Sequence, residues 1–250
     1  MTASNGAGSP RARHEGEAAF TVWGTAIRVK PAVLANLAGL WGLAAWLAGR
    51  GHPERPWSVR ILVGLLSTVA MMVADFGHAM AHIASARYAG APMDEILISE
   101  GMPRTLYYDN DVPPRAHRIR ALGGPIFSAV GLALSCLARS LAPQRSLVRE
   151  VADWSCLGHG FIFGGSLVPL PIVDGGSVLK WTLVEHGRTP EEADEVVAQV
   201  DVSVGAALTA TGVALAATSR QESPARRWLP ALGLIAAGAL AIAFGRGKFR

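Results

Sequence analysis

The sequence predicts an all-α membrane protein with about six transmembrane helices and a short β-hairpin after the second of them. Half of the 250 residues are hydrophobic and only 17% are charged. The mean hydropathy is positive, which is too apolar for a soluble domain of this length. The apolar residues also gather into runs close to the length of a bilayer-spanning helix, and Lys and Arg collect between the runs. We therefore expect an integral membrane protein.

Six apolar segments carry this prediction, and the fourth of them is unusual. That segment contains Asp153, His159 and several glycines, so a broken helix or a re-entrant element is an alternative to a full span. If it is counted as a span, the gaps on one side of the membrane hold more Lys and Arg. The positive-inside rule then places both termini in the cytoplasm. We expect the membrane to be the cytoplasmic membrane of a prokaryote. The six segments are 31–49, 59–86, 121–142, 151–172, 202–218 and 229–245.

The chain divides into a polar tail and one membrane domain. Residues 1–19 have no apolar period and are expected to be a disordered tail. Residues 20–250 form the polytopic membrane domain, which contains a core at 59–180 and a C-terminal helix pair at 202–245. The net charge of +4 is spread beside the apolar runs, so the expected partner is the lipid bilayer and not nucleic acid.

Three shorter features lie between and within the spans. Residues 93–108 place apolar residues on both sides of a Gly and a Pro, which predicts the hairpin at the membrane surface. Thr189 followed by Pro190 predicts the start of a short surface helix that reaches Asp201. Cys136 and Cys156 lie in apolar segments without a nearby second cysteine, so we expect small buried hydrophobic side chains.

Two histidines in the second span form the candidate reactive centre. His78 and His82 are four residues apart, so they share one face of an otherwise apolar helix. This spacing offers two nitrogen ligands to one tetrahedral zinc ion. Two neutral histidines hydrogen-bonded to neighbouring helices would give the same pattern. The pair alone leaves both interpretations open.

Asp174 is a candidate third ligand. It follows Pro169 and Pro171, which break helix geometry at the end of an apolar segment. A carboxylate held there could complete a His, His, Asp site with a fourth position open to water. An ordinary Asp-Gly turn is the alternative.

These residues resemble the motifs of the site-2 protease-like intramembrane zinc metalloproteases. In that family HExxH precedes a small, Arg-containing helix end and Gly-x-Pro, and here Arg87 and Gly90-Ala91-Pro92 follow His82. The family's Asn-x-x-Pro and Asp-Gly match Ser166 to Gly175 in register, and Gly124-Pro125 opens the third span as in the family. The resemblance covers residues 59–180. It implies one zinc ion on His78, His82 and Asp174, and proteolysis of membrane-embedded peptide or protein substrates.

The chain departs from the family at three functional positions. The family's general-base Glu is Ala79 here, which cannot accept a proton. Ser128 and Ser166 replace two Asn residues that anchor the substrate strand, so both remain candidate substrate-binding residues with shorter side chains. The three changes together favour natural divergence over an engineered Glu-to-Ala trap.

Asp75 is the candidate substitute for the missing base. It lies four residues before Ala79 and shares its helix face, but one turn of about 5–6 Å separates them along the axis. A direct replacement would be strained, so a water-relayed proton transfer or support for His78 are the expected roles.

Two functions remain open from sequence. The first is a zinc metalloendopeptidase that cuts a membrane-bound peptide presented as a strand beside the 93–108 hairpin. The second is a non-catalytic pseudoprotease that keeps the fold and binds membrane proteins without cutting them. Ala79, Ser128 and Ser166 favour the second.

Overall fold

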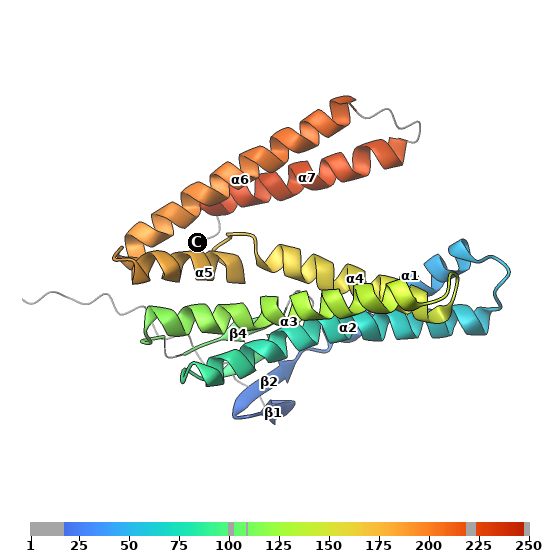
Figure 1. Cartoon of the computed structure of the whole chain (residues 1–250), viewed down its shortest axis with the longest axis horizontal. Helices are drawn as coiled ribbons and strands as arrows, with labels where there is room; N and C mark the ends of the chain where they lie inside the picture. Colours follow the sequence, from blue (N-terminus) through green and yellow to red (C-terminus); the bar gives the residue numbers. More distant parts are fainter. Residues whose placement is uncertain (1–17, 100–102, 109, 219–223, 248–250) are drawn as a thin grey trace, which may run out of the picture. The chain divides into compact units, whose positions relative to one another are not determined.

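The structure, a computed structural model, describes residues 18–99, 103–108, 110–218 and 224–247. Nearly all of the predicted tail, 1–19, lies outside the described residues, and only Ala18 and Ala19 are described. The chain forms two compact units, Met1–Phe163 and Gly164–Arg250. Figure 1 shows the helices and strands of both units along the sequence.

The first unit contains a small sheet and four helices. Its strands are β1 (Phe20–Val22), β2 (Thr25–Val29), β3 (Glu95–Ile98) and β4 (Arg104–Leu106). Its helices are α1 (Ala32–Gly51), α2 (Trp57–Tyr88), α3 (Pro114–Leu141) and α4 (Leu147–Ser166), whose last turn belongs to the second unit. The second unit continues with α5 (Asp174–Glu185), α6 (Pro190–Thr218) and α7 (Pro224–Gly245).

The predicted hairpin after the second span is present as part of a four-stranded sheet. β3 and β4 pair antiparallel, with Ile96 opposite Thr105. The sequence did not predict the second hairpin, β1–β2, which turns at Trp23 and Gly24 with positive φ at both residues. Strand β2 pairs parallel to β3, so the sheet order is β1-β2-β3-β4. The two hairpins therefore share one sheet although some 65 residues separate them.

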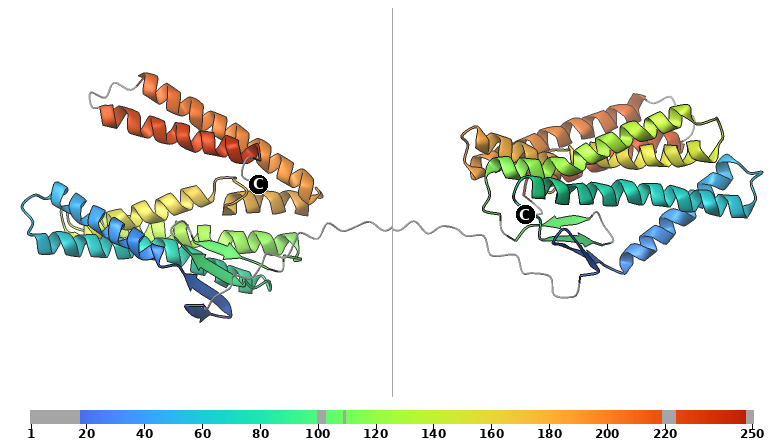
Figure 2. Two further views of the ribbon diagram at one scale, coloured as in Figure 1. Left: turned by 180° about the vertical axis from the view of Figure 1, so that it is seen from behind. Right: turned by 60° about the horizontal axis from the view of Figure 1, so that its bottom comes forward.

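One face of α2 packs against this sheet. The helix contributes Ala79, Ile83 and Ala86 to an apolar cluster, and the sheet contributes Ile27 and Ile96. All five side chains are buried. Figure 2 shows the strands lying beside the helices of this unit. The sheet thus covers the C-terminal part of α2, which is also the part that carries the two histidines.

The opposite side of the same stretch of α2 packs on α3, and the two helices run side by side (Figure 1). A Cβ added to Gly123 would lie 2.6 Å from the carbonyl oxygen of Ala81. A side chain larger than hydrogen would force the helices apart at this level. The Gly123-Gly124-Pro125 segment therefore sets a close approach between α2 and α3.

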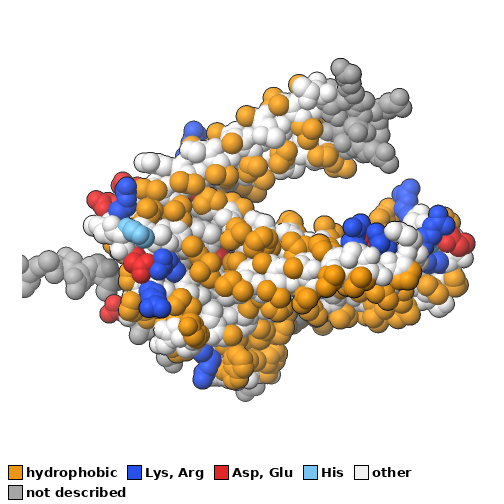
Figure 3. All heavy atoms as spheres, viewed as in Figure 1, with side chains coloured by type: hydrophobic (Ala, Val, Ile, Leu, Met, Phe, Trp, Pro, Cys, Tyr) orange, Lys and Arg blue, Asp and Glu red, His pale blue; other side chains and the backbone are white. Residues whose placement is uncertain are grey.

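The chain is an integral membrane protein with five candidate spans among the described helices. By length and composition these are α1, α2, α3, α6 and the segment Trp228–Gly245 of α7. Their exposed surface is largely hydrophobic, and charged side chains gather near helix ends in Figure 3. The predicted span 151–172 is helical only to Ser166, and the first turns of α4 carry Arg149, Glu150 and Asp153. These charges explain why α4 is less apolar than the other five.

In the second unit, the predicted surface helix and the following span form one helix. Thr189 and Glu192 make reciprocal hydrogen bonds between side chain and backbone, so Thr189 caps the start of α6 as predicted. The helix then continues past Asp201 to Thr218 without a break. Helices α6 and α7 pack side by side (Figure 1), and a Cβ on Gly205 would lie 2.6 Å from the carbonyl oxygen of Gly238.

Candidate metal site

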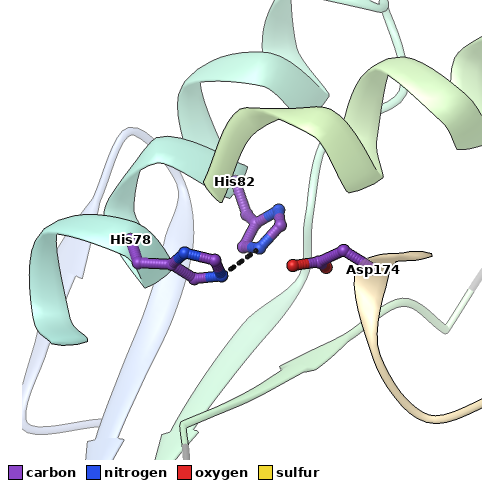
Figure 4. A group of neighbouring side chains, drawn as sticks. All are labelled: His78, His82 and Asp174. Atoms are coloured by element: carbon purple, nitrogen blue, oxygen red, sulfur yellow. Dashed lines mark hydrogen bonds between the residues drawn. The ribbon is translucent and has the colours of Figure 1, made fainter. Parts of the chain in front are cut away.

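His78 and His82 present their ring nitrogens to each other from successive turns of α2. The two Nε2 atoms are 3.2 Å apart. The rings stand nearly perpendicular, at 78°, with centroids 4.9 Å apart, and Figure 4 shows them pointing toward one another. Two nitrogen ligands at about 2.0–2.1 Å from a tetrahedral zinc ion are separated by about 3.3 Å. The histidine pair therefore has the spacing of two ligands of one ion.

The partner of His82 fixes which of its nitrogens can bind a metal. Its Nδ1 lies 2.8 Å from the backbone carbonyl oxygen of Arg120 on α3. A carbonyl oxygen only accepts hydrogen bonds, so Nδ1 carries the proton and Nε2 carries the lone pair. The ring is also buried, with 5% of its surface exposed. A buried imidazole whose Nδ1–H is bonded to a carbonyl is the usual arrangement of a metal ligand.

His78 is oriented in the same manner by a side chain. Its Nδ1 is hydrogen-bonded to Ser128 Oγ at 2.9 Å, and Ser128 is fully buried on α3. In the tautomer that donates to Ser128, both Nε2 lone pairs point into the space between the rings. Two lone pairs at this distance repel unless a proton or a cation lies between them. In the other tautomer His78 Nε2 carries the proton and donates it to His82 Nε2, so the arrangement suits either a hydrogen bond between the rings or a cation bound by both.

Gly124 provides the space for the two rings. A Cβ built on Gly124 would lie 2.4 Å from His78 Nε2 and 2.4 Å from His82 Nε2. Both distances are far below an ordinary non-bonded contact of about 3.5 Å. Only glycine at this position leaves the two nitrogens unobstructed. This contact explains the Gly of the Gly124-Pro125 motif in physical terms.

Two residues that support His82 were not predicted as site residues. Ser85 Oγ donates to the same Arg120 carbonyl at 3.1 Å, from one turn beyond His82. The buried Arg120 side chain donates from Nε to the carbonyl of Ala91 at 2.7 Å and lies over the Tyr107 ring, 4.2 Å from its centroid. Arg120 thus ties α3 to the loop after α2 and to the residue that follows β4.

In the second unit, Asp174 begins α5 three residues after the second of the two prolines, Pro171. Figure 4 labels its carboxylate, which extends from the start of that helix. The two following glycines allow the turn, because a Cβ on Gly175 would lie 2.4 Å from the Leu167 carbonyl oxygen and one on Gly176 would lie 2.0 Å from that of Leu170. The Gly-Gly pair therefore lets the start of α5 pack closely on the loop that precedes it. That Asp174 joins His78 and His82 at one ion remains a prediction.

Ala79, at the position of the missing base, faces the sheet. Its side chain is 3% exposed and belongs to the apolar cluster with Ile27, Ile83 and Ile96. Apolar side chains surround this position closely, and a longer side chain with a carboxylate would have to displace them. Asp75 lies one turn earlier on α2 and is partly buried. Its role as a base or as support for His78 stays a prediction.

The two serines that replace the family's Asn residues are both buried. Ser128 Oγ contacts His78, so its described role is to orient a ligand. Ser166 is the last residue of α4 and is 2% exposed. Their predicted contact with a substrate strand stays a prediction.

Comparison with known proteins supports the fold. No protein-family profile matches the chain, and no curated protein matches it. Among solved structures, the site-2 protease from Methanocaldococcus jannaschii is similar, with a TM-score of 0.52 and 14% sequence identity, over 92% of this chain and 94% of that one. At this identity the likeness concerns the fold. The chain therefore has a site-2 protease-like fold, and the resemblance predicted from the motifs is confirmed at that level.

Proposed function

We propose that this chain is a membrane-embedded, metal-binding homologue of the site-2 proteases that binds a peptide strand without cutting it. One observation carries the proposal: the two histidines keep metal-ligand geometry while the general-base position is an alanine buried in hydrocarbon. The ligand pair and its supports on α3 are retained. The residue that would activate water is absent.

The proposed metal site consists of the His78 and His82 pair of the first unit together with Asp174, which the motif resemblance adds as the third ligand. The donor set of two imidazoles and one carboxylate suits a single zinc ion with a fourth position for water or a carbonyl oxygen. Bound there, zinc supplies a Lewis acid that polarises such an oxygen. The chain's own contribution is to hold both Nε2 atoms in place through Ser128 and the Arg120 carbonyl.

The proposed peptide site is the outer edge of β4. This strand is at one end of the sheet order and pairs with β3 on one side. An edge strand can accept a further strand through backbone hydrogen bonds. β4 also contacts α2, and Tyr107 just beyond it lies under the Arg120 guanidinium. A membrane-protein segment added to β4 would therefore run close to the histidine pair.

The second candidate function is slow proteolysis with Asp75 as a relayed base. Asp75 is the carboxylate on α2 one turn before the vacant base position. Loss of a positioned general base typically lowers a rate by about 10²–10⁴. This candidate predicts weak cleavage that depends on Asp75, whereas the non-catalytic function predicts peptide binding alone.

One experiment separates the two candidates. Detergent-purified protein is assayed for zinc content, for photo-crosslinking to a model transmembrane peptide, and for cleavage of the same peptide. We expect one zinc ion, crosslinking and no cleavage. Cleavage that is lost on Asp75→Asn would establish the peptidase. Zinc content that is unchanged when both His78 and His82 are replaced by alanine would refute the metal site.

The proposed location is the cytoplasmic membrane of a prokaryote, with both termini in the cytoplasm. The five candidate spans alone would place the termini on opposite sides. The proposal therefore requires α4 to act as a sixth crossing despite its three charges, two of which lie in the Arg139–Asp153 and Arg55–Glu150 ion pairs. Paired charges near a helix end are tolerated in a span because they partner one another.

A further inference from the structure

The chain's two cysteines face each other across α3 and α4. Cys136 Sγ and Cys156 Sγ are 3.5 Å apart, and the sequence contains no other cysteine. The expectation of two buried hydrophobic side chains was wrong for Cys136, which is exposed, and Cys156 is partly exposed. Sequence alone could not pair them because they lie on different helices.

Three neighbouring contacts fix the register that brings the thiols together. Ser135 and Ser155 share a hydrogen bond between their hydroxyl oxygens at 2.7 Å. One turn further along α3, Arg139 forms an ion pair with Asp153. One turn in the other direction, the His159 ring fits against Gly131, where a Cβ would lie 2.2 Å from its Cε1. The two helices are antiparallel here, and the thiol pair lies in the middle of these matched contacts.

The small side chains along this seam allow a close approach. A disulfide requires an Sγ–Sγ distance of about 2.05 Å, so the sulfurs must close by about 1.5 Å. Rotation about the Cα–Cβ bonds moves each sulfur without moving either helix. Cys136 is the more exposed of the two thiols, so a dissolved oxidant reaches it first.

We propose that Cys136 and Cys156 are a peroxide-sensitive thiol pair that forms a disulfide between α3 and α4. The sulfur of Cys136 attacks a peroxide oxygen, the O–O bond breaks, and the products are a sulfenic acid and water or an alcohol. The sulfur of Cys156 then attacks the sulfenic sulfur, and the hydroxyl group leaves with the thiol proton as water. The peroxide is reduced by two electrons, which the two thiols supply.

The disulfide links the helices without reaching the metal ligands. Cys136 is eight residues beyond Ser128, which is about 12 Å along a helix. Oxidation therefore restricts the separation of α3 from α4 while the contacts of His78 and His82 stay as they are. The reduced protein holds the two helices together by the hydrogen bond, the ion pair and the packing described above, and the oxidised protein adds a covalent bond.

The test uses the full chain in phosphatidylcholine vesicles treated with hydrogen peroxide. We expect intact-protein mass to fall by two hydrogen atoms, both thiols to become unreactive to maleimide, and a reductant to reverse both changes. The oxidised protein should unfold at a higher temperature with unchanged zinc content. Thiols that both remain reactive, or a disulfide that links two chains only, would overturn the proposal.

Matched variants test the order of events and the register. In Cys156→Ser, peroxide should leave a sulfenic acid on Cys136 that dimedone traps, whereas Cys136→Ser should leave Cys156 mostly reduced. The double variant Cys136→Ser, Leu137→Cys keeps two thiols but turns one by about 100° around α3. Equal disulfide formation in that variant would refute the proposed register.

Discussion

Replacing Gly124 by alanine isolates the space that the two imidazoles occupy. The new methyl carbon would lie 2.4 Å from each Nε2, whereas non-bonded carbon and nitrogen atoms settle at about 3.5 Å. Each ring must therefore retreat by about 1 Å. Neither ring can do so freely, because Ser128 holds Nδ1 of His78 and the Arg120 carbonyl holds Nδ1 of His82.

The expected result of Gly124→Ala is a large loss of zinc affinity. Ligand distances in a zinc site tolerate shifts of about 0.2 Å, so a displacement of about 1 Å removes at least one ligand from the ion. Changes to groups that position ligands commonly cost about 10- to 100-fold in affinity. We expect a loss at the upper end of that range or beyond, which corresponds to about 2.7 kcal/mol or more. A chelator-competition titration in detergent measures it.

Gly160→Ala on α4 is the matched control. The Cβ added there would meet only Leu132 Cδ1 at 3.6 Å, an ordinary contact. This variant should bind zinc with wild-type affinity, and alanine should slightly favour the helix. If Gly124→Ala also bound one zinc ion with wild-type affinity while remaining folded, the ion would not lie between these two nitrogens.

Four further predictions test the parts of the site separately. Ser128→Ala should weaken zinc binding about tenfold by releasing His78 Nδ1, and a variant that lost peptide crosslinking with zinc affinity intact would assign Ser128 to the substrate instead. Ala79→Glu should lower the unfolding temperature, because burying a carboxylate in the apolar cluster costs several kcal/mol of folding free energy. The same variant should not produce cleavage, and efficient cleavage would show that the site lacks only its base. Asp174→Asn should reduce zinc affinity by removing the anionic ligand, and an unchanged titration would exclude Asp174 from the site. Reporter fusions should place both termini in the cytoplasm, and termini on opposite sides would show that α4 does not cross the membrane.

The ligand pair could be predicted from sequence because its spacing depends on local helix geometry, whereas Gly124 entered only through the motif resemblance. Helix periodicity alone places His78 and His82 on one face. The capping of α6 by Thr189 was predictable for the same reason, since the capping box lies within four residues. The continuation of α6 past Asp201 was not, because a polar first half and an apolar second half read as two elements.

The supports of the ligand pair could not be predicted because they depend on contacts between distant segments. Arg120 holds His82 through its backbone carbonyl. Every residue type has this group, so the sequence does not reveal the contact. Strand β2 gains its parallel partner from β3, some 65 residues away. The segment 20–29 is too short to show a clear strand pattern, so its sequence does not predict a hairpin that depends on pairing with β3.

Under the proposed function, the two histidines keep their geometry although no general base accompanies them. With both Nδ1 atoms engaged by α3, the Nε2 atoms face each other at 3.2 Å. A hydrogen bond between the two nitrogens or a cation bound by both removes the repulsion of their lone pairs. The proposed ion would therefore stabilise the contact between α2 and α3 as well as any ligand in its fourth position. Binding of the ion to the folded state alone raises the free energy of unfolding in proportion to the logarithm of its concentration. A metal retained for this reason needs no general base, and Ala79 can then join the hydrocarbon between α2 and the sheet.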